Sequence, residues 1–206
     1  LKAGLAKFPR CAAHMAQVQT DELREPVQKY LTLVVAEMNP TDKGAQRFEA
    51  SRDAKFKERD RLVQRLQDIV QFGVAEISVA ALYQMGELYR DSVQKLLDAP
   101  IPSRIPGYVL TKADKDALKN QLKATVAPII ETAVEAYRLC VEKAYEIGLY
   151  TEWSKRALLR LRELRPETYW PVDERYSASI PTPKPDGYAA ALTSDKGIRL
   201  LPSVAP

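Results

Sequence analysis

The longest helical pattern in the chain spans residues 111–147, TKADKDALKNQLKATVAPIIETAVEAYRLCVEKAYEI. This segment has no glycine, and Pro128 is its one proline. At about 1.5 Å per residue it predicts a helix about 55 Å long, which needs other helices packed along it. Apolar residues recur at spacings of three and four and therefore share one helical face. They are Leu118, Leu122, Val126, Ile129, Ile130, Ala133, Tyr137, Cys140, Val141 and Ala144.

Two helices are expected in the first third of the chain. Pro26 is a suitable first residue for a helix, because its missing N–H costs nothing there. Asn39-Pro40 would end that helix, since the residue before a proline avoids the helical region. Thr41 or Asp42 can cap the next one. Residues 45–72 contain neither proline nor glycine, which favours one long charged helix over a pair of helices turning at its middle.

A third helix is predicted over residues 74–98, directly before the long one. Gly86 lies inside it at a cost of about 1 kcal/mol relative to alanine, which suggests that another helix approaches closely there. Residues 99–107 contain three prolines and cannot continue a helix. We therefore expect a stiff loop that joins two antiparallel helices, with no β-sheet anywhere in the chain.

The chain after the long helix divides into one further helix and a tail. Gly148 suits the position just past a helix end, and Thr151 can cap a helix that reaches Leu164. Residues 166–206 hold seven prolines and no sustained period. We expect a helical domain over residues 1–165 and an extended proline-rich tail over residues 166–206.

Two short patterns resemble parts of a tetratricopeptide repeat (TPR). Leu82-x-x-Met85-Gly86-x-x-Tyr89 is similar to the first helix of the repeat, and Ala133-x-x-x-Tyr137-x-x-Cys140 is similar to the second. The proline loop separates the two by more than a repeat of about 34 residues allows, so the repeat is degenerate. The resemblance implies an all-α fold of antiparallel hairpins in a degenerate TPR-like α-solenoid.

A second resemblance concerns the order of motifs over roughly residues 40–175. Ala99-Pro100-Ile101-Pro102, a long helix, Gly148-Leu149-Tyr150-x-Glu152-Trp153 and Leu164-Arg165-Pro166 follow one another. This order is similar to the C-terminal region of large TPR proteins of bacterial cell envelopes, some of which work in the myxobacterial gliding-motility machinery. The resemblance implies a protein-binding scaffold in the periplasm or cell envelope, with no catalytic residues.

Composition argues for a globular protein without nucleic-acid partners. Hydrophobic residues make up 46% and charged residues 28%. Lysine and arginine exceed aspartate and glutamate by only 31 to 27, and the charges are interspersed. The apolar run 31–36 is too short to cross a bilayer. The chain starts at Leu1, so we expect a fragment or processed product whose membrane association comes only through partners or a missing N-terminal segment.

No pattern in the chain predicts a reaction. One histidine and two distant cysteines cannot form a Cys/His zinc site. The chain shows no phosphate-binding glycine loop and no nucleophile motif. We expect no enzyme activity, cofactor, metal or small-molecule substrate; a lysozyme-like hydrolase would need a polar cleft that the sequence does not indicate. The sequence is compatible with a disulfide between Cys11 and Cys140 and also with two free thiols.

Protein partners are the expected ligands. The predicted surface is a concave face between the helices at 74–98 and 111–147, together with the basic face of the last helix and the aromatic residues after it. The aromatic pair at 169–170 either folds back onto the last helix or anchors a partner. The alternative function is a helical bundle that associates with itself. The candidate binding residues are Tyr83, Tyr89, Tyr137, Arg156, Arg160, Tyr169 and Trp170.

Overall fold

A computed structural model describes residues 8–37, 42–105 and 107–169 of the chain. The chain divides into the units Leu1–Tyr169 and Trp170–Pro206, and all described residues belong to the first. In order, its elements are α2 (Pro9–Thr32), α3 (Asp42–Val70), α4 (Ala75–Leu97), β1 (Arg104–Ile105), β2 (Tyr108–Val109), α5 (Lys112–Glu146) and α6 (Glu152–Leu164). The predicted all-α class is confirmed, while the finer repeat architecture stays a prediction.

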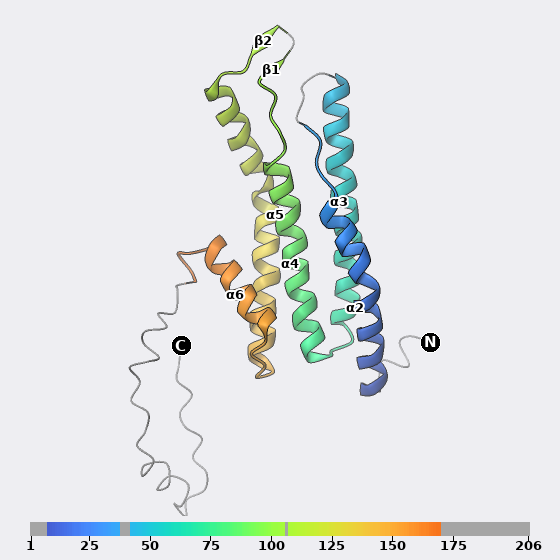
Figure 1. Ribbon diagram of the computed structural model, residues 1–206. Coiled ribbons are helices and arrows are strands. Elements are labelled where there is room, and N and C mark those ends of the chain that lie inside the picture. The colour runs from blue at the N-terminus through green and yellow to red at the C-terminus, as the bar shows by residue number, and fades with distance from the viewer. Residues whose placement is uncertain (1–7, 38–41, 106, 170–206) are drawn as a thin grey trace, which may run out of the picture. The chain divides into compact units, whose positions relative to one another are not determined.

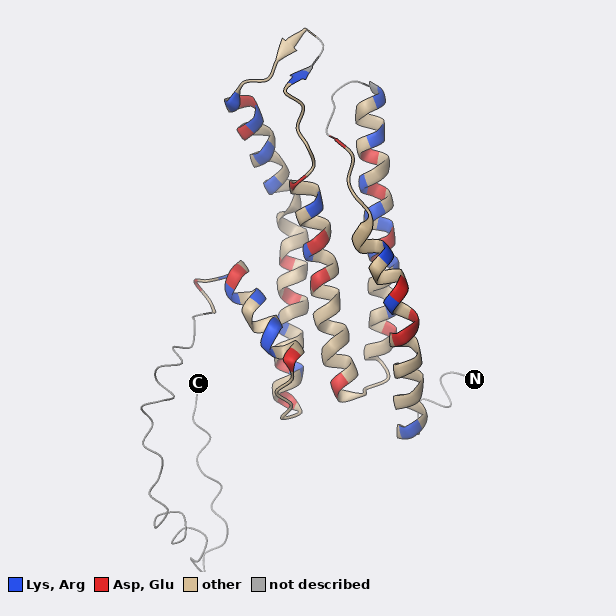
Figure 2. Cartoon of the chain, in the orientation of Figure 1, with Lys and Arg blue, Asp and Glu red and all other residues tan. Residues whose placement is uncertain are grey.

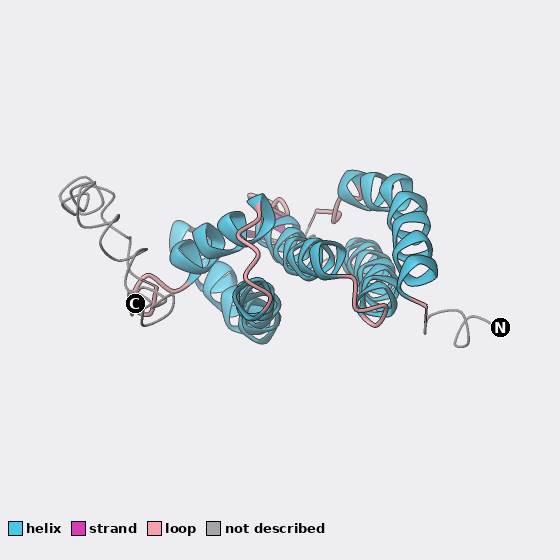
Figure 3. Cartoon of the chain, turned by 90° about the horizontal axis from the view of Figure 1, so that it is seen from below, coloured by secondary structure: helices cyan, strands magenta, loops and turns pink. Residues whose placement is uncertain are grey.

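Helix α4 occupies the centre of this unit. It packs against α2, α3, α5 and α6, and its closest partner is α5 (Figures 1 and 3). Its buried side chains face several neighbours at once, so α4 is apolar over most of its surface. The main hydrophobic core therefore runs along α4, with contributions from α2, α3, α5 and α6.

The predicted long helix is α5. Thr111 caps its start: the hydroxyl accepts a hydrogen bond from the Asp114 N–H, and the Asp114 carboxylate accepts one from the Thr111 N–H. Gly148 follows its end with φ +64°, a conformation that glycine adopts without steric cost. Pro128 lies on an exposed face within the helix. Because these signals are local, the sequence predicted both ends.

The predicted close crossing at Gly86 is confirmed. A Cβ atom added to Gly86 would lie 2.5 Å from Cε1 of Tyr137 in α5. Tyr137 is fully buried, so its ring has packed neighbours on every side. The absent side chain at Gly86 therefore admits the tyrosine ring and lets α4 and α5 pack closely.

The prediction that a helix begins at Pro26 is wrong. Helix α2 starts at Pro9, a residue that suits a first helical turn, and Pro26 lies inside it. An internal proline loses one backbone hydrogen bond. The continuous helix offsets this loss by burying one face along its length, formed by Ala12, Ala16, Leu23 and Tyr30.

The predicted end of this helix is also wrong. Helix α2 stops at Thr32, and residues 33–37 belong to no helix. Val35 is buried in a second apolar cluster, whereas Val34 is 72% exposed. The backbone N–H of Ala36 donates to Ser51 Oγ of α3 at 2.9 Å, which ties this segment to α3. The proposed stop at Asn39-Pro40 and the proposed cap at Thr41 lie outside the described residues.

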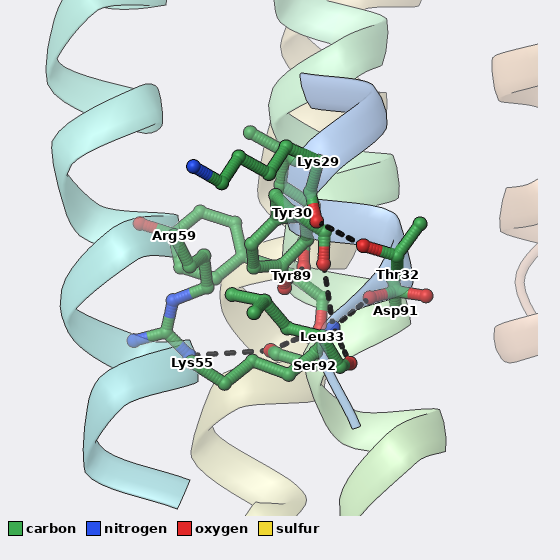
Figure 4. Close-up of polar contacts among 10 residues, drawn as sticks. Lys29, Tyr30, Thr32, Leu33, Lys55, Arg59, Tyr89, Asp91 and Ser92 are labelled. Carbon is green, nitrogen blue, oxygen red and sulfur yellow. Dashed lines mark hydrogen bonds and ion pairs between the residues drawn. The ribbon is translucent and has the colours of Figure 1, made fainter. Parts of the chain in front are cut away.

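A buried lysine contacts the end of α2 (Figure 4). Lys55 of α3 is 0% exposed, and its Nζ donates to the carbonyl oxygens of Tyr30 at 3.2 Å and Leu33 at 2.9 Å. The Leu33 carbonyl lies just past the last helical residue, and the Tyr30 carbonyl also accepts the Leu33 N–H at 3.0 Å. A helix C-terminus favours a positive charge. Nζ also pairs with Asp91 Oδ2 of α4 at 2.7 Å. One side chain thus links α2, α3 and α4.

Neighbouring polar groups complete this cluster. The Tyr30 hydroxyl donates to the Leu88 carbonyl at 3.0 Å, and Arg59 Nη1 donates to Ser92 Oγ at 3.2 Å. Burial lowers the pKa of the Lys55 ammonium, and the hydrogen bond and charge of Asp91 oppose that shift. Lys55 is enclosed on all sides, so the cluster stabilises the fold and offers no surface to a ligand.

The expectation of no sheet is wrong for one short segment. Residues of the proline loop form an antiparallel hairpin in which Arg104 pairs with Val109 and Ile105 with Tyr108. Gly107 at the turn has φ +78°. The Tyr108 hydroxyl donates to Asp114 Oδ2 at 2.9 Å, which fixes the hairpin to the start of α5. A strand of two residues is too short to show alternating hydrophobicity, so the sequence gave no signal for it.

Candidate functional site

The predicted concave face between α4 and α5 is filled by side chains. Tyr137 is 0% exposed and Tyr83 is 8% exposed, and their ring centroids lie 5.9 Å apart. Tyr89 is half-buried beneath the Arg59 guanidinium, whose Cζ lies 5.0 Å from the ring centroid. These three candidate residues therefore pack the interior of the helical unit and present little surface to a partner.

Arg160, another candidate residue, belongs to a cluster of polar side chains around Glu87. The Glu87 carboxylate accepts hydrogen bonds from the Tyr137 hydroxyl at 2.7 Å, from Arg160 Nε at 2.9 Å and from Arg90 Nη2 at 3.0 Å. Arg160 Nη1 also donates to Glu163 at 2.8 Å. Burial alone would raise the pKa of Glu87, but these hydrogen bonds and the two arginine charges hold it below its ordinary value. The cluster joins α4, α5 and α6.

The lowered pKa of Glu87 predicts that the folded protein loses stability as the pH falls through the acid range. A carboxylate with a lowered pKa in the folded state stabilises the protein above its unfolded pKa, and this contribution disappears as the pH falls through the folded value. We expect Glu87→Gln to lower the free energy of unfolding by about 1–2 kcal/mol at pH 7. The difference from the wild type should shrink between about pH 5 and pH 3.

Urea unfolding at several pH values measures this difference. The matched control is Glu49→Gln, which removes an exposed carboxylate on α3 and should change little. If the difference in unfolding free energy between the wild type and Glu87→Gln stays the same from pH 7 to pH 3, Glu87 does not have this role.

The basic face of α6 is largely neutralised by neighbouring carboxylates. Arg156 Nε pairs with Glu152 at 3.2 Å, and Arg165 pairs with Glu131 of α5. Exposed pairs of this kind contribute little to stability, but they reduce the net positive charge available to a partner. Of the two aromatic candidates that follow, Tyr169 packs against the main core and donates its backbone N–H to the Arg165 carbonyl at 3.0 Å. Trp170 lies outside the described residues.

A groove lies over α4, on the side where α2 and α6 flank it. Its volume is about 460 Å³, within the range of about 300–1,000 Å³ that binding sites occupy. Helix α4 supplies the floor, α2 supplies one wall and Trp153 of α6 supplies the other. The lining residues are Gln17, Thr20, Leu23, Arg24, Val27, Gln28, Glu76, Ile77, Ala80, Gln84 and Trp153.

Trp153 contacts two neighbouring side chains. Its centroid lies 5.5 Å from that of Tyr83, and the Arg156 guanidinium carbon lies 5.7 Å from it. The candidate Arg156 therefore borders the groove through Trp153 rather than acting as a free charge. Stacking and cation–π contacts fix an aromatic ring at low entropic cost, which favours its use as a binding surface.

The lining of this groove combines five apolar residues, Leu23, Val27, Ile77, Ala80 and Trp153, with six polar ones. Amides of Gln17, Gln28 and Gln84 can donate and accept hydrogen bonds. Only Arg24 and Glu76 carry charge, and Arg24 already pairs with Asp21 at 3.2 Å. Such a lining suits an apolar segment that carries a few hydrogen-bonding groups.

A second groove, of about 600 Å³, lies between α2 and α3. Its lining is mostly charged and includes Glu22, Glu25, Lys29, Glu58 and Arg61. Arg61 and Glu58 form two hydrogen bonds with each other, at 2.6 and 2.9 Å. Because the opposite charges are paired and intermixed, this groove has no strong preference for a charged ligand.

The described residues show no other arrangement with evident chemistry. Within them, no three His, Cys, Asp or Glu side chains are grouped so as to hold a metal ion. Both cysteines are free thiols; Cys140 is buried with Sγ 3.3 Å from the Val79 carbonyl, and burial raises its pKa to about 12. Among the described helices, none combines the length and hydropathy needed to cross a bilayer.

Sequence reasoning missed the groove over α4. Ile77, Ala80 and Gln84 follow the spacing i, i+3 and i+7 on a second face of α4, and this spacing was the available signal. The walls come from residues far away in the sequence, so their meeting could not be read from local patterns.

Comparison with known proteins gives no match: no protein-family model, curated protein or solved structure is similar to this chain.

Proposed function

We propose that this chain is a non-catalytic adaptor that binds an apolar segment of another protein in the groove over α4. The observation that carries this proposal is the position of Trp153, which is half-buried, contacts Tyr83 and Arg156, and lines the groove together with Ile77 and Ala80. Aromatic anchors of this kind contribute much of the binding energy in protein interfaces.

A partner helix fits this groove better than a charged metabolite. The floor residues Ile77 and Ala80 and the wall residue Val27 offer apolar contact, and glutamines line the edges. An amphipathic helix can place apolar anchors on such a floor and leave its polar residues at the edges. Because the lining has only Arg24 and Glu76 as charged groups, we infer that the bound segment has little net charge.

The proposed cellular setting comes from the sequence resemblance. A TPR-type scaffold in a bacterial cell envelope, with gliding motility as one possible process, agrees with a helical unit that binds proteins along its surface. We propose this setting on the motif order around the proline loop and the last helix.

Selection of peptides from a random library tests the proposal. Peptides are first selected for binding to the wild type. Those that also bind the Ala80→Arg variant are then discarded, because the long arginine side chain would occupy the groove and such peptides bind elsewhere. We expect selected peptides to share apolar residues at helical spacing and to have low net charge. Fluorescence anisotropy should show that Ala80→Arg weakens their binding by at least about tenfold.

The matched control is Ala50→Arg, which places the same side chain on an exposed site of α3 and should leave binding unchanged. Peptides that bind the wild type and Ala80→Arg equally would contradict the proposal. If light scattering shows a dimer that Ala80→Arg dissociates, the groove binds a second copy, and the chain is a self-associating helical subunit instead.

A further inference from the structure

The N-terminal half of α5 carries four lysines on one helical face. Lys112, Lys115, Lys119 and Lys123 follow one another at spacings of three, four and four residues, so they form a single stripe along the helix. The stripe extends for about 16 Å, at about 1.5 Å per residue. In Figure 2 the half of α5 that follows β2 carries several blue positions, which are Lys or Arg, with red acidic positions among them.

These lysines differ from three arginines of the α6 segment, Arg156, Arg160 and Arg165. Within the described part of the chain, none of the four forms an ion pair, whereas Arg156, Arg160 and Arg165 each have a carboxylate partner. Four lysines against Asp116 on the same stripe give a net charge of +3. Asp114 keeps its negative charge, because hydrogen bonds from Thr111 and Tyr108 lower its pKa, but its position two residues after Lys112 places it off this stripe.

An exposed apolar hairpin tip lies at the start of the helix that carries this stripe. Tyr108 is 49% exposed and Val109 is 57% exposed, although both directly precede α5. The hydrogen bond from Tyr108 to Asp114 holds the tip against the first turn, where Lys112 and Lys115 begin the stripe. A fixed apolar tip beside a row of free cations is a combination that neither α6 nor the groove over α4 presents.

We propose that this end of the molecule, formed by β1–β2 and the N-terminal half of α5, binds the surface of an anionic phospholipid membrane. The lysines contact lipid phosphates, and Tyr108 and Val109 enter the boundary between headgroups and acyl chains. Stable attachment of a peripheral protein takes two such signals, one apolar and one polybasic. Aromatic residues with a polar tip favour this boundary.

Duplex nucleic acid fits these features less well. A phosphate backbone would attract the lysines, but it would leave the exposed Val109 in water and gain nothing from it. The overall charge of +4 is also small for a nucleic-acid-binding protein. The membrane surface is the one partner that uses both the charge and the apolar tip.

Co-sedimentation with vesicles tests this proposal. We expect the chain to bind vesicles of phosphatidylglycerol and phosphatidylcholine in equal parts, and not vesicles of phosphatidylcholine alone. Replacing all four stripe lysines by glutamine should reduce the partition coefficient by at least about tenfold. Raising the salt concentration should weaken the binding of the wild type, because salt screens the lysine charges.

The control variant replaces Lys29, Lys43, Lys57 and Lys155 by glutamine. These four lysines are exposed and lie on other helices, so the change in net charge is identical and binding should be retained. Equal losses in both variants would overturn the proposal, since only general charge would then matter. Circular dichroism of each variant establishes that both are folded.

Val109→Trp examines insertion of the tip. We expect its additional tryptophan emission to shift to shorter wavelength with the anionic vesicles and to stay unchanged with phosphatidylcholine. An unshifted emission in the bound state would overturn the insertion. Binding of duplex DNA that the stripe variant abolishes, without binding to vesicles, would identify nucleic acid as the partner and overturn the proposal as a whole.

Discussion

Replacing Lys55 by methionine is expected to lower the free energy of unfolding by about 3 kcal/mol, because it leaves the Asp91 carboxylate partly buried without its partner. The Asp91 side chain is 19% exposed and lies 2.7 Å from Nζ. The same change removes the donor to the Tyr30 and Leu33 carbonyls at the end of α2. Methionine is close to lysine in size, so the loss reflects charge and hydrogen bonding rather than a cavity. Urea unfolding measures it.

Two further variants separate the causes. Lys57→Met removes an exposed lysine two residues away and should cost little. The double variant Lys55→Met/Asp91→Leu should be more stable than Lys55→Met alone, because no uncompensated charge remains. A cost below about 1 kcal/mol for Lys55→Met, typical of an exposed ion pair, would show that Lys55 does not join the three helices.

Gly86→Leu is expected to destabilise the protein by about 1–3 kcal/mol through overpacking against Tyr137. Helix propensity alone predicts the opposite sign, since leucine exceeds glycine by about 1 kcal/mol in a helix. The contact decides the outcome: the new Cβ would meet Cε1 at 2.5 Å, and the buried ring has no space to move into. The melting temperature should therefore fall.

Ala124→Leu is the control for this substitution, because Ala124 is exposed on α5 and can accept the larger side chain. A double-mutant cycle of Gly86→Ala with Tyr137→Val should show coupling, since a smaller residue at 137 leaves room for the new methyl group. A rise in the melting temperature of Gly86→Leu would show that α4 and α5 do not cross closely at this point.

The sequence predicted the parts of the fold that depend on local signals. The long helix α5 follows from its apolar period, from Thr111 before it and from Gly148 after it. The close crossing at Gly86 follows from the cost of a glycine inside a helix, which packing must offset. In each case the residues that carry the signal lie within a few turns of the feature they predict.

The parts that the sequence did not predict depend on distant residues. The end of α2 at Thr32 brings the Tyr30 and Leu33 carbonyls to Lys55 of the next helix, which also pairs with Asp91 of a third helix. Proline at position 26 is tolerated because the whole α2 face packs against the core. The groove over α4 joins α2 and α6, which lie at opposite ends of the described chain.

The candidate site shows the same division. Aromatic residues at helical spacing were selected as partner contacts, yet Tyr83 and Tyr137 are buried in the core. Periodicity identifies which residues share a face but not whether another helix covers that face. Trp153 contacts Tyr83 and also borders the groove, a double role that only the packing of α6 on α4 reveals.

Site-specific photo-crosslinking in the native source tests the central claim, that the groove over α4 binds another protein. A photoreactive phenylalanine analogue at Gln84 places the reactive group within the groove, and the same analogue at Gln121 places it on an exposed face of α5. We expect a discrete protein adduct from position 84 that is absent from position 121 and is lost when Ala80→Arg is added. Adducts of equal pattern and yield from both positions, or an adduct at position 84 that persists with Ala80→Arg, would contradict it.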